Sequence, residues 1–218
     1  MDRHLQLYES MFWFLFFCPS FLGIQMLNHS AKIRLFIDTT LKLNSCIELT
    51  TEQSRYLFAV MRLVLRSKIL VIDGRTGEYE AEIIDKKAKT GTIKLLSKTR
   101  DILYPPDLWL LFAPIRPSRT KIIVEKATEL GVTVIKPVIT ERTNYRDLNM
   151  KKMRLIMREA LEQCGGTFIP RLDEPKYLGS VLESWPADRS LVYCDEKLAE
   201  VDNKVEHRAL SVCHSAGI

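Results

Sequence analysis

The chain has 218 residues, of which 46% are hydrophobic and 27% are charged, and its formal net charge is +5. This composition excludes a disordered tail and supplies enough apolar surface for two modest domains or one large one. The excess of Lys and Arg is compatible with a polyanionic partner, although many small globular proteins carry a similar charge.

Residues 1–25 form an apolar leader that we expect to lie outside the fold. The run Met11–Ile24 is shorter than the roughly 20 apolar residues that cross a bilayer as a helix, and Pro19 interrupts it. The leader lacks both the positive start and the small-residue cleavage site of a signal peptide. We therefore predict no membrane attachment, and we interpret Met26 as the natural start of the protein.

Residues 26–100 predict a small β-barrel covered by one helix. The helical spacing of Leu57, Val60, Met61 and Val64, behind Thr51 as a candidate N-cap, predicts the helix. The strands alternate in hydrophobicity and are bounded by glycine turns. They are expected at Ile33–Ile37, Cys46–Leu49, Ile69–Ile72, Tyr79–Ile83 and Thr92–Leu95.

Residues 101–107 contain Pro105-Pro106 and predict a linker, because proline neither continues a helix nor donates to a central ladder. From residue 108 to residue 218, strands alternate with helices, which predicts a parallel α/β sheet. Strands are expected at Leu108–Phe112, which is apolar enough for burial on both faces, at Val134–Ile139 and at Leu191–Cys194.

Two amphipathic helices are expected between these strands. Ser118 is a candidate N-cap of the first, and Gly131 suits its C-terminal end. The expected buried positions are Ile123, Ala127 and Leu130 in the first helix, and Met153, Ile156, Met157, Ala160 and Cys164 in the second.

Two groups of cations are candidate phosphate contacts. The first group either binds phosphates or forms a solvated face; it consists of Lys86, Lys87, Lys89, Lys94, Lys98 and Arg100. The second group consists of Arg116, Arg119 and Arg142 with Glu141, at or just after the C-terminal ends of predicted parallel strands, where open α/β sheets build sites. Arg142 could stabilise a developing anion, or it could pair with Glu141 or Glu159.

Three linked segments carry a resemblance to one family. They are Ala113-Pro-Ile-Arg-Pro-Ser-Arg119, then Glu125–Val132 leading into Pro137–Thr143, and Glu159-Ala-Leu-Glu-Gln-Cys-Gly165. Together they resemble the RsmE-type ribosomal RNA methyltransferases of the SPOUT (trefoil-knot) superfamily, and Tyr56–Leu63 and Asp73–Glu78 resemble that family's PUA-like barrel. The family usually has Arg where this chain has Gly166.

The resemblance implies a PUA-like RNA-binding barrel followed by a SPOUT α/β domain, which methylates N3 of a uridine in small-subunit (16S) ribosomal RNA. It implies S-adenosylmethionine as the methyl donor and the ribosomal RNA or particle as the partner, in the cytoplasm. The expected RNA contacts are Arg34, Arg62, Arg116, Arg119, Glu141, Arg142 and Gln163, and Arg142 is the candidate catalytic residue.

The resemblance also implies an incomplete cofactor site. The family builds this site in a knot from three loops, and the chain ends where the second, glycine-rich loop would begin. The first loop, Cys194, Asp195 and Glu196, would be the cofactor contact that remains. We therefore expect an incomplete SPOUT domain with no threaded knot, no donor bound by this chain alone and no family-type homodimer. Two functions remain open: a methyltransferase impaired by the missing loops, and a non-catalytic RNA-binding remnant.

Metal and disulfide chemistry are not expected. His207, Cys213 and His214 lack the compact Cys or His pairs of a zinc site. The five cysteines are odd in number and scattered, which favours free thiols in a reducing compartment. Cys164 has no catalytic context and is expected in the core.

Overall fold

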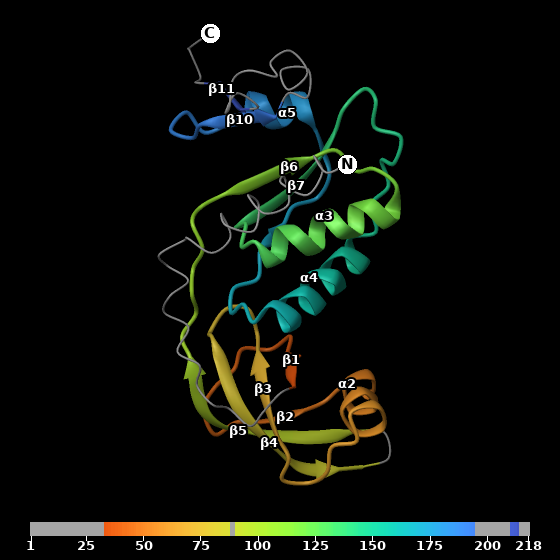
Figure 1. Cartoon of the computed structure of the whole chain (residues 1–218), viewed down its shortest axis with the longest axis vertical. Coiled ribbons are helices and arrows are strands. Elements are labelled where there is room, and N and C mark those ends of the chain that lie inside the picture. The colour runs from red at the N-terminus through yellow and green to blue at the C-terminus, as the bar shows by residue number, and fades with distance from the viewer. Residues whose placement is uncertain (1–32, 88–89, 195–209, 214–218) are drawn as a thin grey trace, which may run out of the picture.

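The computed structural model describes residues 33–87 and 90–194, and the backbone of residues 210–213. Figure 1 shows a curved sheet at one end of the molecule, an α/β layer beyond it, and helix α4 between them. Several predictions concern residues outside the described ranges, namely the leader, Lys89, Asp195, Glu196, His207, His214 and the side chain of Cys213. The expected absence of a knot also depends mostly on the C-terminal segment outside these ranges.

The N-terminal part is a five-stranded sheet in the order β1-β3-β4-β5-β2, which curls into a half-barrel. Strands β1 and β3 are parallel, and the other pairs are antiparallel. Register shifts between β4 and β5 mark bulges, which bend and twist such a sheet. All five predicted strands are present, at Arg34–Phe36 (β1), Cys46–Glu48 (β2), Lys68–Ile72 (β3), Glu78–Lys86 (β4) and Gly91–Arg100 (β5).

The helix of the half-barrel differs from the prediction. Thr50, not Thr51, caps α2 (Thr51–Arg55) and forms a capping box with Gln53. The chain then makes a π-helical turn, η2 (Tyr56–Val60), which ends the 3.6-residue period. The consequence is that Leu57 is buried, whereas the other three positions expected on the apolar face are exposed, namely Val60, Met61 and Val64.

The α/β layer is built on parallel strands around β7. Strand β7 pairs with β6 on one side and with β8 and then β9 on the other. Helices α3 and α4 pack against each other and, through Val124, Met153 and Ile156, against Leu110 and Phe112 of β6. The elements are Trp109–Phe112 (β6), Pro117–Glu129 (α3), Val134–Ile139 (β7), Met150–Cys164 (α4), Arg171–Leu172 (β8), Lys176–Tyr177 (β9) and Leu178–Glu183 (α5).

Three helix details were predicted wrongly. Pro117 is the first residue of α3, so Ser118 lies inside the helix and is not its cap. Leu130 follows the helix and is 73% exposed, although Gly131 adopts the expected positive φ of 77°. In α4 the expected positions Met153, Ile156, Met157 and Ala160 are buried, but the buried face ends at Leu161 and Cys164 is exposed.

Two strands of the α/β part also differ from expectation. Strand β6 is half-buried throughout, because among the described residues it pairs with β7 alone and packs helices over one face. Leu191–Cys194 is a strand (β10), but it pairs antiparallel with β11 (Leu210–Cys213) and does not extend the parallel sheet. The parallel partners of β7 are the short β8 and β9, which no pattern predicted.

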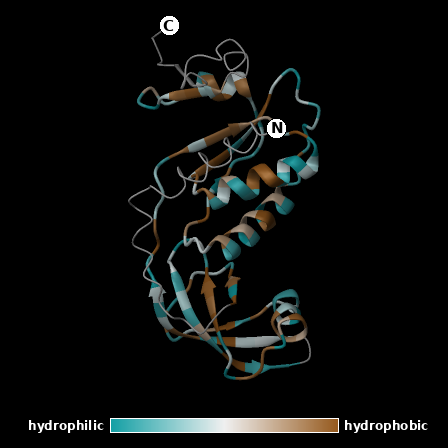
Figure 2. Cartoon of the chain, viewed as in Figure 1, coloured by the Kyte–Doolittle hydropathy of each residue, from teal (hydrophilic) through white to brown (hydrophobic). Residues whose placement is uncertain are grey.

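Hydrophobic residues are concentrated in the sheets, most clearly along β3, while the helices carry mixed faces (Figure 2). This is the pattern of a globular fold whose helices cover a sheet on one side. Within the described ranges, no helix combines the length and apolar character needed to cross a bilayer.

Candidate functional site: a basic cleft

An open cleft of about 460 Å³ lies at the C-terminal ends of β6 and β7. These two strands are parallel neighbours, so the loops that follow them leave the sheet at the same edge. The loop after β6 contributes one wall and the loop after β7 contributes the other. The lining residues are Pro114, Ile115, Arg116, Arg119, Arg142, Asn144 and Tyr145.

The wall from β6 is fixed by the start of α3. Thr120 is buried, and its hydroxyl donates to the Ile115 carbonyl at 2.9 Å and accepts from the Ile115 N–H at 3.1 Å. Pro117 at the first helical position presets the helical backbone. Arg116 and Arg119 therefore project from a rigid helix start, where the N-terminal peptide dipoles add to the attraction for an anion.

The wall from β7 is a tight turn closed by two threonines. The Thr143 hydroxyl accepts from the Thr140 N–H at 2.8 Å, and the Thr143 N–H donates to the Thr140 carbonyl at 3.1 Å. Thr143 is 6% exposed, so its buried side chain holds the turn in place. The anchor places Arg142 and Tyr145 on the same rim of the cleft.

The cleft carries three positive charges. Arg116, Arg119 and Arg142 all have exposed side chains. Within the described part of the chain, none of the three forms an ion pair, which removes the predicted alternative that Arg142 pairs with Glu141 or Glu159. Unpaired guanidinium groups around a concave surface suit phosphate, which they bind in bidentate fashion.

Sequence reasoning missed two residues of this site. Asn144 supplies an amide that can donate and accept, and Tyr145 supplies an aromatic face that is 43% exposed. The signal that could have found them is their position directly after Arg142, in the loop that follows a parallel strand.

The other predicted contacts lie elsewhere. Glu141 is exposed in the β7 loop without lining the cleft, Gln163 is exposed near the end of α4, and Arg62 is exposed on the half-barrel after η2. Arg34 is different in kind, because its side chain is 11% exposed and pairs with Glu78. An arginine enclosed in this way is poorly placed for RNA.

The lysine run on β4 and β5 is largely neutralised by its surroundings. Lys87 pairs with Asp85, and Lys98 pairs with Asp101. Lys86 donates to the Leu63 carbonyl and lies over the Phe58 ring. These contacts favour the solvated-face interpretation, since the carboxylates of Asp85 and Asp101, which flank the run, offset part of its positive charge.

The candidate cofactor loop is described at Cys194 alone, whose side chain is exposed at the end of β10. The role of this loop in donor binding therefore stays a prediction, because Asp195 and Glu196 lie outside the described residues. Within the same ranges, no group of three or more His, Cys, Asp or Glu side chains gathers closely enough to hold a metal ion.

Two family models match the chain. The model described as the RNA methyltransferase domain matches residues 104–214, and the model described as the RNA methyltransferase PUA domain matches residues 49–96. The first match contains the whole basic cleft. The second falls within the half-barrel.

Curated relatives named ribosomal RNA small subunit methyltransferase E are similar to this chain. The protein of Rickettsia conorii is 29% identical over 131 residues, which are 60% of this chain and 54% of the relative. The protein of Synechocystis sp. is 29% identical over 175 residues, which are 76% of this chain and 56% of the relative. The chain thus spans about half the length of these curated relatives.

Solved structures share the fold. The crystal structure of a ribosomal RNA small subunit methyltransferase E from Neisseria gonorrhoeae, bound to S-adenosyl methionine, has a TM-score of 0.63 at 23% identity and covers 71% of this chain and 66% of that one. A putative methyltransferase from Legionella pneumophila, in complex with the same cofactor, has a TM-score of 0.62 at 25% identity, with coverage of 70% and 66%. The expected PUA-like barrel and SPOUT-type α/β layer are thereby confirmed as the fold class.

Proposed function

Because the chain belongs to the RNA methyltransferase family, of the ribosomal RNA small subunit methyltransferase E type, we propose that it takes part in S-adenosylmethionine-dependent N3-methylation of a uridine in small-subunit ribosomal RNA. The observation that carries this proposal is the basic cleft, in which three arginines without ion-pair partners in the described residues meet at the ends of parallel strands. The proposed substrate implies a cytoplasmic protein.

The cleft residues divide into two proposed roles. Arg116 and Arg119 hold RNA phosphates, which fixes the position of the strand without reading its sequence. Tyr145 offers its face to a base that has left the stack, the usual state in which single-stranded RNA is recognised. The two roles together would hold one nucleotide with its base edge exposed to chemistry.

Arg142 is the proposed catalytic group. Methylation at N3 requires the uracil to lose the N3 proton, which leaves negative charge on the ring. A guanidinium in a preorganised loop stabilises such charge as it develops. The methyl donor supplies the electrophilic methyl group, and Cys194, Asp195 and Glu196 remain the proposed contacts of this chain with that donor.

The same cleft supports a second candidate function, RNA binding without methyl transfer. Arginines that hold phosphates need no cofactor, and the described part of the candidate donor loop is exposed. Binding and catalysis therefore have to be measured separately.

The test uses the protein and small-subunit ribosomal RNA in two assays. Fluorescence anisotropy across a salt series measures binding, which we expect to weaken steeply as salt rises. Mass spectrometry then looks for N3-methyluridine in small-subunit particles that lack the modification, after incubation with S-adenosylmethionine. Product formation supports the methyltransferase. Salt-sensitive binding without product supports the second candidate, and a chain that binds RNA no better than a neutral control protein refutes both.

A further inference from the structure

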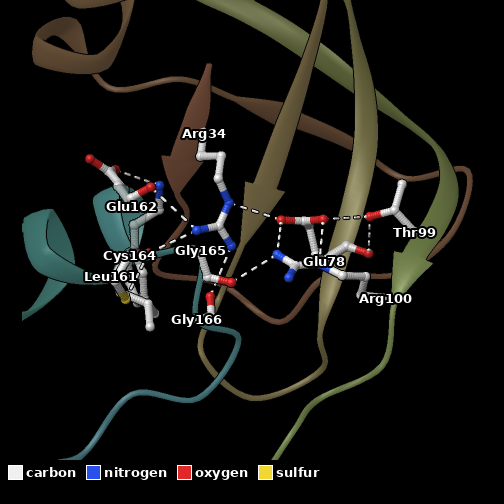
Figure 3. Close-up of polar contacts among 10 residues, drawn as sticks. Arg34, Glu78, Thr99, Arg100, Leu161, Glu162, Cys164, Gly165 and Gly166 are labelled. Atoms are coloured by element: carbon white, nitrogen blue, oxygen red, sulfur yellow. Dashed lines mark hydrogen bonds and ion pairs between the residues drawn. The ribbon is translucent and has the colours of Figure 1, made fainter. Parts of the chain in front are cut away.

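We propose that Glu78 is a positioning residue, which locks the half-barrel onto the end of α4 so that the barrel surface and the basic cleft hold one RNA as a single rigid body. The inference rests on the proposed RNA binding. Figure 3 shows the group that we call the Glu78 clamp, which consists of Arg34, Glu78, Arg100 and the turn Gly165–Gly166.

Glu78 is the centre of the clamp and is almost completely enclosed, with a side chain that is 2% exposed. Its Oε2 accepts from Arg34 Nε at 2.9 Å and from Arg100 Nη2 at 2.6 Å, and its Oε1 accepts from Arg100 Nε and the Thr99 hydroxyl, each at 2.9 Å. Burial opposes ionisation, but the hydrogen bond from Arg100 and the charges of both arginines lower the pKa of Glu78 below its usual range. The carboxylate is therefore charged and fully hydrogen-bonded.

The two arginines extend from the half-barrel to the end of α4. Arg34 Nη1 donates to the Leu161 carbonyl and Nη2 to the Gly166 carbonyl, both at 2.9 Å. Arg100 Nη2 donates to the Gly165 carbonyl at 2.9 Å. Carbonyls at a helix C-terminus have no partner within the helix and carry its negative dipole end. Gly165 makes them accessible by adopting a left-handed conformation with φ of 75°.

Apolar and backbone contacts surround the clamp. Phe36 and Ile72 of the half-barrel pack against Leu161 of α4, with Ile169 beside them. The chain also passes so close at Gly74 that an added Cβ would lie 2.5 Å from Ile169 Cγ2. The joint is thus tightly packed around Glu78, and the low local dielectric at this enclosed carboxylate strengthens the charged hydrogen bonds that it accepts.

We expect the Glu78 clamp to fix the orientation of the half-barrel relative to α4 more than it raises the stability of the fold. Buried ion pairs can often be replaced by apolar side chains with little loss of stability, whereas hydrogen bonds to fixed carbonyls are directional. Helix α4 lies between the half-barrel and α3, whose start carries Arg116 and Arg119 (Figure 1). The clamp therefore connects the barrel to the helix layer under the cleft.

The fixed angle matters for an RNA that contacts both ends. Arg62 is exposed on the half-barrel, and the cleft arginines are exposed on the α/β layer. When the two surfaces are held in one orientation, an RNA bound to one of them meets the other at a high effective concentration. This advantage is lost when the half-barrel can change its orientation relative to the α/β layer. A short RNA that reaches the cleft alone gains nothing from the clamp.

The experiment compares Arg100→Met with Lys68→Met. Arg100 is 40% exposed, so its loss leaves no cavity in the core. Lys68→Met removes the same charge but breaks the Lys68–Glu80 pair inside the half-barrel. Affinity is measured for a long fragment of small-subunit ribosomal RNA and for an oligouridine of about four nucleotides. Spin-label distances are measured between Cys46 in β2 and a label introduced by Ile122→Cys in α3, with all other cysteines replaced by Ser.

For Arg100→Met we expect a broader distance distribution and an affinity for the long RNA that falls about tenfold more than that for the short one, because a freely moving connection lowers the effective concentration of the second RNA-binding surface. Arg100→Lys should recover part of both effects and provides the test if Arg100→Met does not fold. Lys68→Met should change both affinities equally. An unchanged distance distribution, or equal losses for both RNAs, overturns the proposal. A protein that binds neither RNA overturns the proposed function, and the distances still decide on the clamp.

Discussion

The Phe36 N–H of β1 donates to Glu162 Oε1 of α4 at 2.7 Å, across 126 positions of the chain. This bond joins the half-barrel to the α/β layer beside the Glu78 clamp. Burial raises the pKa of the Glu162 carboxyl, against the opposing effects of the Phe36 N–H and Arg34. The joint therefore holds one carboxyl group, Glu78, that is stabilised as an anion and another, Glu162, that is not.

Replacing Glu162 with Gln should raise the melting temperature by a few degrees near neutral pH. The amide oxygen still accepts from Phe36, and the buried charge is gone. Because the folded pKa is raised, the wild-type protein loses stability as pH increases from the unfolded carboxyl pKa of about 4.3 through the raised value. The advantage of the variant should shrink below about pH 4. Calorimetry over a pH series measures this, and Glu183→Gln, at an exposed position, is the control.

Glu78→Gln should have the opposite effect and destabilise the protein by about 3 kcal/mol or more, because it leaves two arginines close together with no anion between them. The lowered pKa of Glu78 means that its contribution is present above the unfolded carboxyl pKa and is lost as pH falls through the folded value. Urea unfolding near neutral pH and in acid measures the free energy of unfolding of both proteins. We expect the difference in this free energy between Glu78→Gln and the wild type to be smaller in acid. A constant difference would speak against the ion pairs.

Gly74→Ala should destabilise the joint. The backbone φ of Gly74 is 71°, a conformation that costs a residue with a side chain about 1–2 kcal/mol. The new methyl group would also collide with Ile169. The matched control is Gly179→Ala in α5, where a Cβ meets nothing within 4 Å; there we expect no loss, or a gain of about 0.4–1 kcal/mol. Equal melting temperatures for the two variants would contradict the packing.

Alanine substitution of Arg116, Arg119 or Arg142 should weaken RNA binding and lower the slope of log affinity against log salt by about one for each phosphate that the protein no longer neutralises. Arg171→Ala is the control, because Arg171 lies on β8 beside the start of β7, at the opposite edge of the same sheet. Anisotropy titrations at several salt concentrations measure both the affinity and the slope of log affinity against log salt. If the salt slope changes as much for Arg171→Ala as for the cleft variants, RNA responds to the overall positive charge and does not bind at the cleft.

Much of the fold could be predicted, because its signals are local. Alternation and glycine turns marked the five strands of the half-barrel, and helical periodicity marked α4. The prediction failed where the helical period changes, as in η2, where a π turn takes Val60 and Met61 out of the buried face. It also failed for β8 and β9, which are two residues long and exist as strands only because β7 pairs with them.

The candidate site was predicted in part. The motif positions of Arg116, Arg119 and Arg142, after two apolar runs, placed them at one edge of a parallel sheet, and the cleft lies there. Their RNA role stays a prediction. Asn144 and Tyr145 were missed because polar and aromatic residues in a loop carry no periodic signal.

The sequence alone determined most of the element types, the parallel layer and the family, since periodicity, turn residues and motifs are properties of neighbouring residues. The tertiary structure decided what each cation does. Arg34 and Arg116 are the same residue type and each follows an isoleucine, yet Arg34 is largely enclosed against Glu78 and Arg116 faces the cleft. The reason is that the environment of a charge depends on which carboxylates and carbonyls folding brings within hydrogen-bonding distance, and the partners of Arg34 lie 44 and 127 positions away.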